Sequence, residues 1–274
     1  MVPPDGDFRF VPALLISTTL VSSCQSPAPP PDAKKTRAEV LVAAAADLSV
    51  AFAEMGKLFE ARTGQKVTFS FGASGALAKQ LSEGAPFDMF AAANASFVDK
   101  AVHAGACDGG TKALYARGHL VVWTKAAGPG QQGLSLRTLA DLQHESVKKI
   151  AIANPEHAPY GKAAREALTR AGLWPALVSK IVQAENVRQA LQFAQTGNAD
   201  VAIVALSLVA KDRTGTSLAV DPGLHGAIEQ TLVVCRHGKN AAGGREFAKL
   251  VASSDGQALL ERYGFGGSAE QPGK

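Results

Sequence analysis

The feature that most constrains the fold is an alternation of apolar, strand-like runs with segments of helical periodicity. Residues 39–45 (EVLVAAA) form an apolar run that is typical of a strand covered on both faces. Apolar residues at helical spacing follow it, and Thr63 with the next glycine ends that helix. The alternating run 66–71 (KVTFSF), a helix over 76–81 and a buried strand over 87–92 continue the order. This is the order of a parallel sheet with crossover helices, so the sequence predicts an α/β fold.

The rest of the chain continues the same pattern, and its 274 residues suffice for one large or two modest α/β domains. A Gly/Gln/Ser-rich stretch over 126–136 is typical of a loop. The further expected strands lie at 120–124, 149–153, 201–205 and 230–235, and the further expected helices at 161–171, 175–181, 186–196 and within 244–260.

The first residues have the pattern of an export signal. Residues 11–21 (VPALLISTTLV) are apolar but too few to span a bilayer, so we expect a signal peptide over 1–23. The following Cys24 resembles a lipoprotein processing site, and its lipidation would anchor the chain to a membrane. A Pro/Ala-rich tether follows over 24–37. The rival expectation is a soluble periplasmic protein that is cut nearer Ala28; both place the chain in the periplasm or another extracytoplasmic space.

Charge and cysteine content narrow the function. The net charge is +4 and no Lys/Arg block runs through the chain, so we expect no nucleic-acid partner. After Cys24 only Cys107 and Cys235 remain. An oxidising compartment permits a disulfide between them, but Cys235 ends an apolar, strand-like run, so we expect two separate thiols. The His and Cys residues show no metal-ligand spacing, so we expect neither a bound metal nor a cofactor.

Two turns between a strand and a helix carry chemistry. They lie at 46–49 (ADLS) and 73–76 (ASGA), and Ser74 adds a hydroxyl to the second. Ligands of open parallel sheets bind at the carboxyl ends of the strands. A helix that starts there presents unpaired N–H groups and the positive end of its dipole, which favours an anion without needing Lys or Arg.

At this point the sequence resembles the molybdate-binding proteins of bacterial ABC importers. The similarity covers roughly residues 38–266, and each motif is weak alone. The motifs are VAAAADL (42–48), FGASGALA (71–78), GAPFDMF (84–90), NPEHAPYG (154–161), AENVR (184–188) and RYGF (262–265).

The resemblance implies a type II periplasmic binding protein fold, in which two α/β lobes are joined by two crossings and the ligand lies in the cleft. We place the crossings near 118–120 and 207–210. The expected lobes are residues 38–119 plus 208–267 and residues 120–207, followed by a flexible tail over 268–274.

The resemblance also implies a transport function without catalysis. A monomeric chain would capture molybdate or tungstate and deliver it to the permease of an ABC importer. The protein would hold the metal of the oxyanion only through its oxygens, by way of Ser74 and Val187, with no direct metal ligand. The contact positions that match the family are Asp47, Ser74 and Ala205, together with Tyr160 and Val187, each of which would donate its backbone N–H.

Two of these positions depart from the family pattern, because Asp47 stands in place of a serine and Ala205 in place of a tyrosine. A carboxylate at about 4 Å from a charged ligand repels it by about 4 kcal/mol at an effective dielectric constant near 20. We expect Asp47 to cap its helix and Lys162 to pair with it, with Ser49 or Ser207 as a replacement hydroxyl. The alternative is a ligand that carries a proton, such as phosphate or arsenate.

A remote alternative is a serine hydrolase that uses Ser74. The segment 72–76 (GASGA) is close to the nucleophile elbow G-x-S-x-G but lacks its last glycine. Its acid and base could be Asp221 with His225 or Asp200 with His237, although neither histidine lies in a strong motif.

Overall fold

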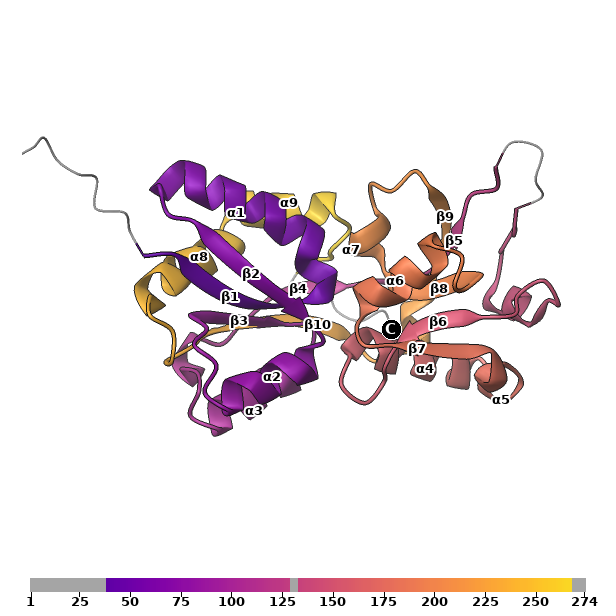
Figure 1. Ribbon diagram of the computed structural model, residues 1–274, viewed down its shortest axis with the longest axis horizontal. Helices are drawn as coiled ribbons and strands as arrows, with labels where there is room; N and C mark the ends of the chain where they lie inside the picture. The colour runs from indigo at the N-terminus through magenta and orange to yellow at the C-terminus, as the bar shows by residue number, and fades with distance from the viewer. Residues whose placement is uncertain (1–37, 129–132, 268–274) are drawn as a thin grey trace, which may run out of the picture. The chain divides into compact units, whose positions relative to one another are not determined.

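The strands of the computed structural model form two separate five-stranded mixed sheets, one in each of two lobes (Figure 1). The structure describes residues 38–128 and 133–267. The two sheets have the same kind of order, β2-β1-β3-β10-β4 and β7-β6-β8-β5-β9. This is the two-lobed periplasmic binding protein fold that the sequence resemblance implies.

The first lobe is built around a sheet in which four strands run in one direction and a fifth runs in the opposite direction. Its strands are β1 (Val40–Ala45), β2 (Val67–Gly72), β3 (Met89–Ala92), β4 (Ala113–Gly118) and β10 (Ile228–Val234). Strand β10 lies between β3 and β4 and is antiparallel to both. The apolar run predicted as a strand is β1, which pairs with β2 on one side and β3 on the other and is almost wholly buried.

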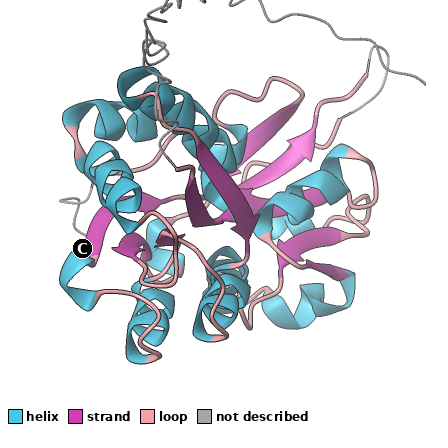
Figure 2. Cartoon of the chain, turned by 60° about the vertical axis from the view of Figure 1, so that its left-hand side comes forward, coloured by secondary structure: helices cyan, strands magenta, loops and turns pink. Residues whose placement is uncertain are grey.

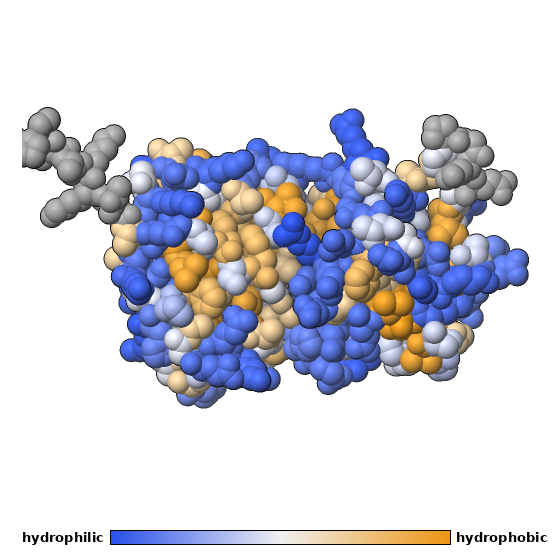
Figure 3. Space-filling view, in the orientation of Figure 1, coloured by the Kyte–Doolittle hydropathy of each residue, from blue (hydrophilic) through white to orange (hydrophobic). Residues whose placement is uncertain are grey.

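Helices cover both faces of this sheet, as Figures 1 and 2 show. One face packs against α1 and α8, and the other against α2 and α3. The helices of this lobe are α1 (Ser49–Thr63), α2 (Ser74–Ser82), α3 (Ala95–His103), α8 (Ala241–Ala252) and α9 (Ser254–Arg262). Strand β2 lies at the sheet edge, and apolar surface between α1 and α2 is visible in Figure 3.

The second lobe repeats this plan with a sheet that packs mainly against α6 on one face and α4 on the other. Its strands are β5 (Leu120–Lys125), β6 (Ile150–Ala153), β7 (Ile181–Ala184), β8 (Val201–Ala205) and β9 (Gly215–Ala219). Its helices are α4 (Pro159–Arg170), α5 (Trp174–Leu177), α6 (Val187–Gln195) and α7 (Leu206–Val209). Short 3-10 turns occur at η1 (Ala46–Leu48), η2 (Gly109–Thr111), η3 (Leu139–Gln143), η4 (Val178–Lys180) and η5 (Pro222–Leu224).

The first crossing between the lobes lies where it was expected, at His119 between β4 and β5. The second does not. We expected it near 207–210, but β9 pairs with β5 in the second sheet, and the chain returns to the first sheet only with β10. The segment 215–219 therefore belongs to the second lobe. The expected crossing coincides with α7, which directly follows β8 and packs against α1 of the first lobe, although the chain then returns to the second sheet.

The two remaining cysteines form a disulfide, Cys107–Cys235, so the expectation of two separate thiols was wrong. Backbone hydrogen bonds on both sides of the pair align the segments. Asp108 N donates to Val234 O and Arg236 N donates to Ala106 O, each at 2.8 Å. These bonds hold the end of β10 beside the segment that follows α3. The sequence pattern did not indicate that these two segments are neighbours.

No helix of the described residues is both long enough and apolar enough to cross a membrane. Several expected segments lie outside the described residues. They are the signal peptide over 1–23, the tether over 24–37, which includes Cys24, and the tail over 268–274.

Candidate functional site

Three helix N-termini, from both lobes, meet at one small cavity. Helix α2 follows β2, α4 follows β6 and α6 follows β7, so each helix starts beyond the carboxyl end of a strand. The cavity measures about 10 Å³, which is room for about one water molecule. The lining residues are Ala45, Ala46, Asp47, Gly72, Ala73, Ser74, Ala93, Ala158, Pro159, Tyr160, Asn186 and Val187. They include no Lys, Arg or His, so the donors that face this cavity are neutral.

Ser74, the first residue of α2, is fully buried beside the cavity. Its Oγ accepts a hydrogen bond from Ala93 N at 3.1 Å, which leaves the hydroxyl proton for a second partner. The next residue, Gly75, donates its N–H to His157 O at 2.9 Å and so links the two lobes. A side chain at Gly75 would come within 2.8 Å of His157 Cβ, so this approach of the lobes requires a glycine.

The second lobe contributes the first turns of α4 and α6. Asn186 caps α6, because its Oδ1 accepts hydrogen bonds from the N–H groups of Arg188 and Gln189, both at 3.1 Å. The N–H of Val187, the first residue of α6, has no acceptor within the helix. Tyr160 lies in the first turn of α4, so its N–H also has no acceptor within its helix. The expected positions Asp47, Ser74, Tyr160 and Val187 thus line one cavity.

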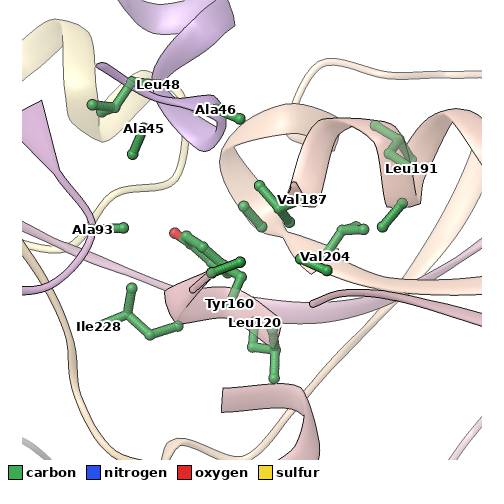
Figure 4. Packing of buried hydrophobic residues seen from close by; sticks show 14 of the residues in the cluster. Ala45, Ala46, Leu48, Ala93, Leu120, Tyr160, Val187, Leu191, Val204 and Ile228 are labelled. Carbon is green, nitrogen blue, oxygen red and sulfur yellow. The ribbon is translucent and has the colours of Figure 1, made fainter. Parts of the chain in front are cut away.

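The side chain of Tyr160 extends toward the first lobe. Figure 4 shows its hydroxyl oxygen directed to the side of Ala45 and Ala93. A Cβ atom at Gly118, on β4, would collide with this oxygen, so the glycine makes room for it. The hydroxyl is buried without a hydrogen bond of good geometry, but it lies near enough to Asp47 to lower the pKa of that carboxyl.

Asp47 does not cap a helix, contrary to the expectation. It lies inside the 3-10 turn η1, and α1 begins only at Ser49, without a side-chain cap. The inserted turn directs the carboxylate toward β10, where Oδ2 accepts a hydrogen bond from Gln230 Nε2 at 2.6 Å. Gln230 was not among the expected site residues. It stands between Glu229 and Thr231, just before the apolar end of β10, so nothing in the sequence distinguishes it from its polar neighbours, and only the structure shows that it is buried against Asp47.

The carboxyl group of Asp47 is almost completely buried, with a relative exposure of 1%. This burial raises its pKa from the ordinary 3.8 to about 7, against the smaller lowering effects of Tyr160 and Gln230. Burial also raises the pKa of the Tyr160 and Tyr115 hydroxyls, which are therefore neutral at physiological pH. Oδ1 of Asp47 has no hydrogen-bond partner.

The expected partner Lys162 does not reach Asp47. It lies on the exposed side of α4 and pairs with Glu166 one turn later, with 3.8 Å between Nζ and Oε1. Ala205, the last residue of β8, is buried against Leu120 and is not among the residues that line the cavity. Neither position therefore contributes a side chain to this site.

Ser49 and Ser207, which were expected to supply a replacement hydroxyl, do not line the small cavity. Ser207 Oγ donates to the backbone oxygen of Asp47 at 2.8 Å, so its proton is engaged. Ser49 Oγ is buried without a partner, and this residue lines an adjoining, larger cavity of about 640 Å³. That cavity shares Ala46 and Asn186 with the smaller one and has Arg188 on its wall.

The two acids proposed for a hydrolase, Asp221 and Asp200, accept hydrogen bonds from backbone N–H groups and do not line the cavity that contains Ser74. Asp221 caps η5 by accepting from Gly223 N at 2.8 Å, and Asp200 accepts from the N–H groups of Lys148 and Lys149. No histidine lines the cavity that contains Ser74, so no base stands beside its hydroxyl. In the part of the chain that the structure describes, no cluster of three or more His, Cys, Asp or Glu could hold a metal ion.

A family model described as bacterial extracellular solute-binding protein matches residues 40–266. The chain belongs to this family. The molybdate-binding protein ModA of Rhodobacter capsulatus is 36% identical over 83% of this chain and 88% of its own length. ModA of Azotobacter vinelandii is 37% identical over 84% of this chain and 90% of its own length. A putative ABC transporter substrate-binding lipoprotein of Bacillus subtilis is 30% identical over 92% and 95%.

Solved structures agree with the fold. The periplasmic molybdate-binding protein of Azotobacter vinelandii superposes with a TM-score of 0.77 and 28% identity over 83% of this chain and 98% of its own. The sulfate-binding protein SubI of Mycobacterium tuberculosis has a TM-score of 0.70 at 17% identity, which shows the fold alone. The resemblance that the sequence motifs indicated is confirmed.

Proposed function

We propose that this chain is an extracytoplasmic binding protein that captures molybdate or tungstate and delivers it to the permease of an ABC importer. The observation that carries the proposal is the convergence of the N-termini of α2, α4 and α6 on one buried cavity without basic side chains. A tetrahedral dianion needs many short hydrogen bonds from all sides, and N–H groups at helix starts supply them in fixed directions.

The names of the relatives support the choice of ligand. Two relatives at 36% and 37% identity are called molybdate-binding proteins, and both align over most of their length. The disulfide Cys107–Cys235 is consistent with an oxidising space outside the cytoplasm. The lipidated Cys24 and the monomeric state remain parts of this proposal, as does the absence of catalysis.

Capture requires movement of the lobes, because the cavity of about 10 Å³ is smaller than a tetrahedral oxyanion. We infer a hinge motion about the two crossings, which separates α2 from α4 and α6. The N–H groups of Tyr160 and Val187 would then close on an anion that is already bound to Ser74. Discrimination against sulfate, which carries the same charge on shorter bonds, would follow from the size of the closed cavity.

The test is a calorimetric titration of the purified protein with molybdate, tungstate, sulfate and phosphate at neutral pH. We expect heat from molybdate and tungstate only. Binding of phosphate or arsenate in their place would favour a protonated ligand that donates a hydrogen bond to Asp47. No binding of any of these anions would refute the proposal.

Replacing Ser74 with alanine tests the contact directly. We expect Ser74→Ala to weaken molybdate binding by about 1–3 kcal/mol, because a hydrogen bond to a charged ligand is lost. Ser82→Ala is the matched control, since Ser82 lies at the other end of the same helix and its hydroxyl donates to Ala78 O. An unchanged dissociation constant for Ser74→Ala would remove this hydroxyl from the site.

A further inference from the structure

The carboxyl group of Asp47 lies in the wall of the anion cavity without a counter-charge. One oxygen, Oδ2, accepts from the neutral amide of Gln230, and the other, Oδ1, is buried without a partner. Among the described residues, no ion pair within 4 Å includes Asp47. The charged form of a buried carboxyl in such surroundings is disfavoured, because neither water nor a cation stabilises the charge, so the group binds a proton readily when a further negative charge approaches.

The groups that face Asp47 are neutral. From α4 comes the Tyr160 hydroxyl, from β4 the Tyr115 hydroxyl and from β10 the Gln230 amide. From α1 comes Ser49, which is buried nearby, and from α7 comes Ser207, which donates to the Asp47 backbone.

The charged side chains on these elements are engaged elsewhere or face another cavity. On α4, Lys162 pairs with Glu166, and between β4 and β10, Arg117 pairs with Glu229 at 3.6 Å. On α6, Arg188 is exposed and lines the larger cavity. On α1, Glu54 pairs with Arg262 and with Lys211, which follows α7. His157, in the loop before α4, does not line the cavity that contains Asp47, and its backbone oxygen accepts from Gly75 N.

An oxyanion in the same cavity would repel a carboxylate at Asp47. Both charges would be excluded from water, and the small volume of the cavity brings them close together. A like charge nearby favours protonation of a carboxyl group. Protonation of Oδ1 would remove the repulsion and would convert an acceptor without a partner into a donor.

We propose that the protein takes up one proton when it binds its oxyanion, and that Oδ1 of Asp47 carries this proton. This proposal rests on the proposed function and deepens it. The proton comes from the solvent and no other bond changes: the carboxylate, a proton and the dianion become a carboxylic acid beside the dianion. The new O–H donates a hydrogen bond, and the uptake makes capture sensitive to pH in the range where Asp47 of the free protein titrates.

The experiment is a titration of the purified protein with molybdate, followed by calorimetry from pH 6 to pH 9 in pairs of buffers that differ in ionisation enthalpy. The slope of the measured heat against the buffer enthalpy gives the number of protons taken up. We expect about 0.9 proton per anion at pH 8 and about 0.1 at pH 6, since the free carboxyl titrates near pH 7. The affinity should fall by about tenfold for each pH unit above 7.5.

Asp47→Asn is the diagnostic variant, because the amide has the shape of the acid, offers a donor and does not titrate. We expect it to bind molybdate with an affinity that is the same from pH 6 to pH 9 and without proton uptake. Glu156→Gln is the matched control, since Glu156 is an exposed acid that pairs with Arg165 at 3.0 Å, outside the cavity. This variant should keep the uptake and the pH dependence.

The outcomes separate this proposal from the proposed function. Molybdate binding without proton uptake, at an affinity that does not change with pH, would overturn the role of Asp47 and leave the function intact. Uptake that persists in Asp47→Asn would assign the proton to another group and would also overturn it. No binding at any pH would overturn both. The measurements on the unaltered protein decide the proton count even if the variant fails to fold.

Discussion

Burial of Asp47 affects the stability of the folded protein as well as its ligand site. The pKa of this carboxyl is raised from 3.8 to about 7 in the folded state. Between about pH 4 and pH 7 the unfolded chain therefore loses a proton that the folded chain keeps, so the free energy of unfolding decreases as the pH rises. Below pH 4 and above pH 7 the effect is constant. A shift of about three pH units corresponds to about 4 kcal/mol over this window.

Asp47→Asn should remove this loss of stability. We expect the variant to be more stable than the original protein at pH 8, by up to about 4 kcal/mol, and to lose most of that advantage at pH 4.5. Urea denaturation of both proteins at the two pH values, without ligand, measures the difference. A stability difference that is the same at both pH values would contradict the buried, unpaired state of the carboxyl.

Among the single elements, α6 has an N-terminus that affects both stability and ligand binding, because Asn186 caps the helix there and lines the cavity. Removal of the cap by Asn186→Ala should destabilise the protein by about 0.5–2 kcal/mol, because two N–H groups lose their acceptor. We also expect weaker molybdate binding, since the N–H of Val187 is then held less firmly. Thermal denaturation and calorimetry measure the two effects.

Asn240→Ala is the control for this prediction. Asn240 caps α8 in the first lobe by accepting from Gly243 N at 3.0 Å, and it does not line the anion cavity. This variant should lose stability and keep its affinity. Equal losses of affinity in the two variants would show that binding follows overall stability and not the geometry of α6.

The elements around the site were largely predictable, because buried strands and capped helices have strong patterns. The apolar runs gave β1, β6 and β8 within two residues of their bounds, and the start of α6 followed from Asn186. The edge strand β2 was predicted from its alternating run, but the edge strands β4, β7 and β9 were missed. Strand β9 (GTSLA) is mostly exposed and has no apolar run, and the expected helix over 175–181 overlaps only the first residue of β7. Their backbone pairing, which depends on the neighbouring strand, defines them more than their side chains do.

The residues of the site were predictable where the backbone supplies the donor and not where a distant side chain does. Helix starts at Ser74, Tyr160 and Val187 follow from local sequence. The surroundings of Asp47 do not, because Gln230 lies 183 positions away and reaches it only through the order of the sheet. The pairing of Cys107 with Cys235 depends on the same strand, β10, and was missed for the same reason.

The disulfide constrains the whole molecule, since its cysteines are 128 positions apart in the sequence and the segment between them includes the entire second lobe. Its loss, by reduction or in the double variant Cys107→Ser with Cys235→Ser, should lower the free energy of unfolding by about 2–5 kcal/mol. We expect the affinity for molybdate to be unchanged, because neither cysteine lines the cavity. Urea denaturation with and without reductant measures the effect, and the double variant should not respond to the reductant. A large loss of affinity on reduction would contradict this separation of the disulfide from the site.

The position of β10 has a consequence for how the protein is assembled. This strand pairs with β3 and β4 at once, yet it follows the whole second lobe in the chain. A nascent or translocating chain that has not yet delivered residues 228–234 leaves one edge of β3 and one edge of β4 without a partner, and such bare edges promote aggregation. The second lobe, by contrast, comes from a single continuous stretch and has all its strands by residue 219. Folding of this protein is therefore completed by its first lobe, whose first strand is made earliest and whose sheet is completed last.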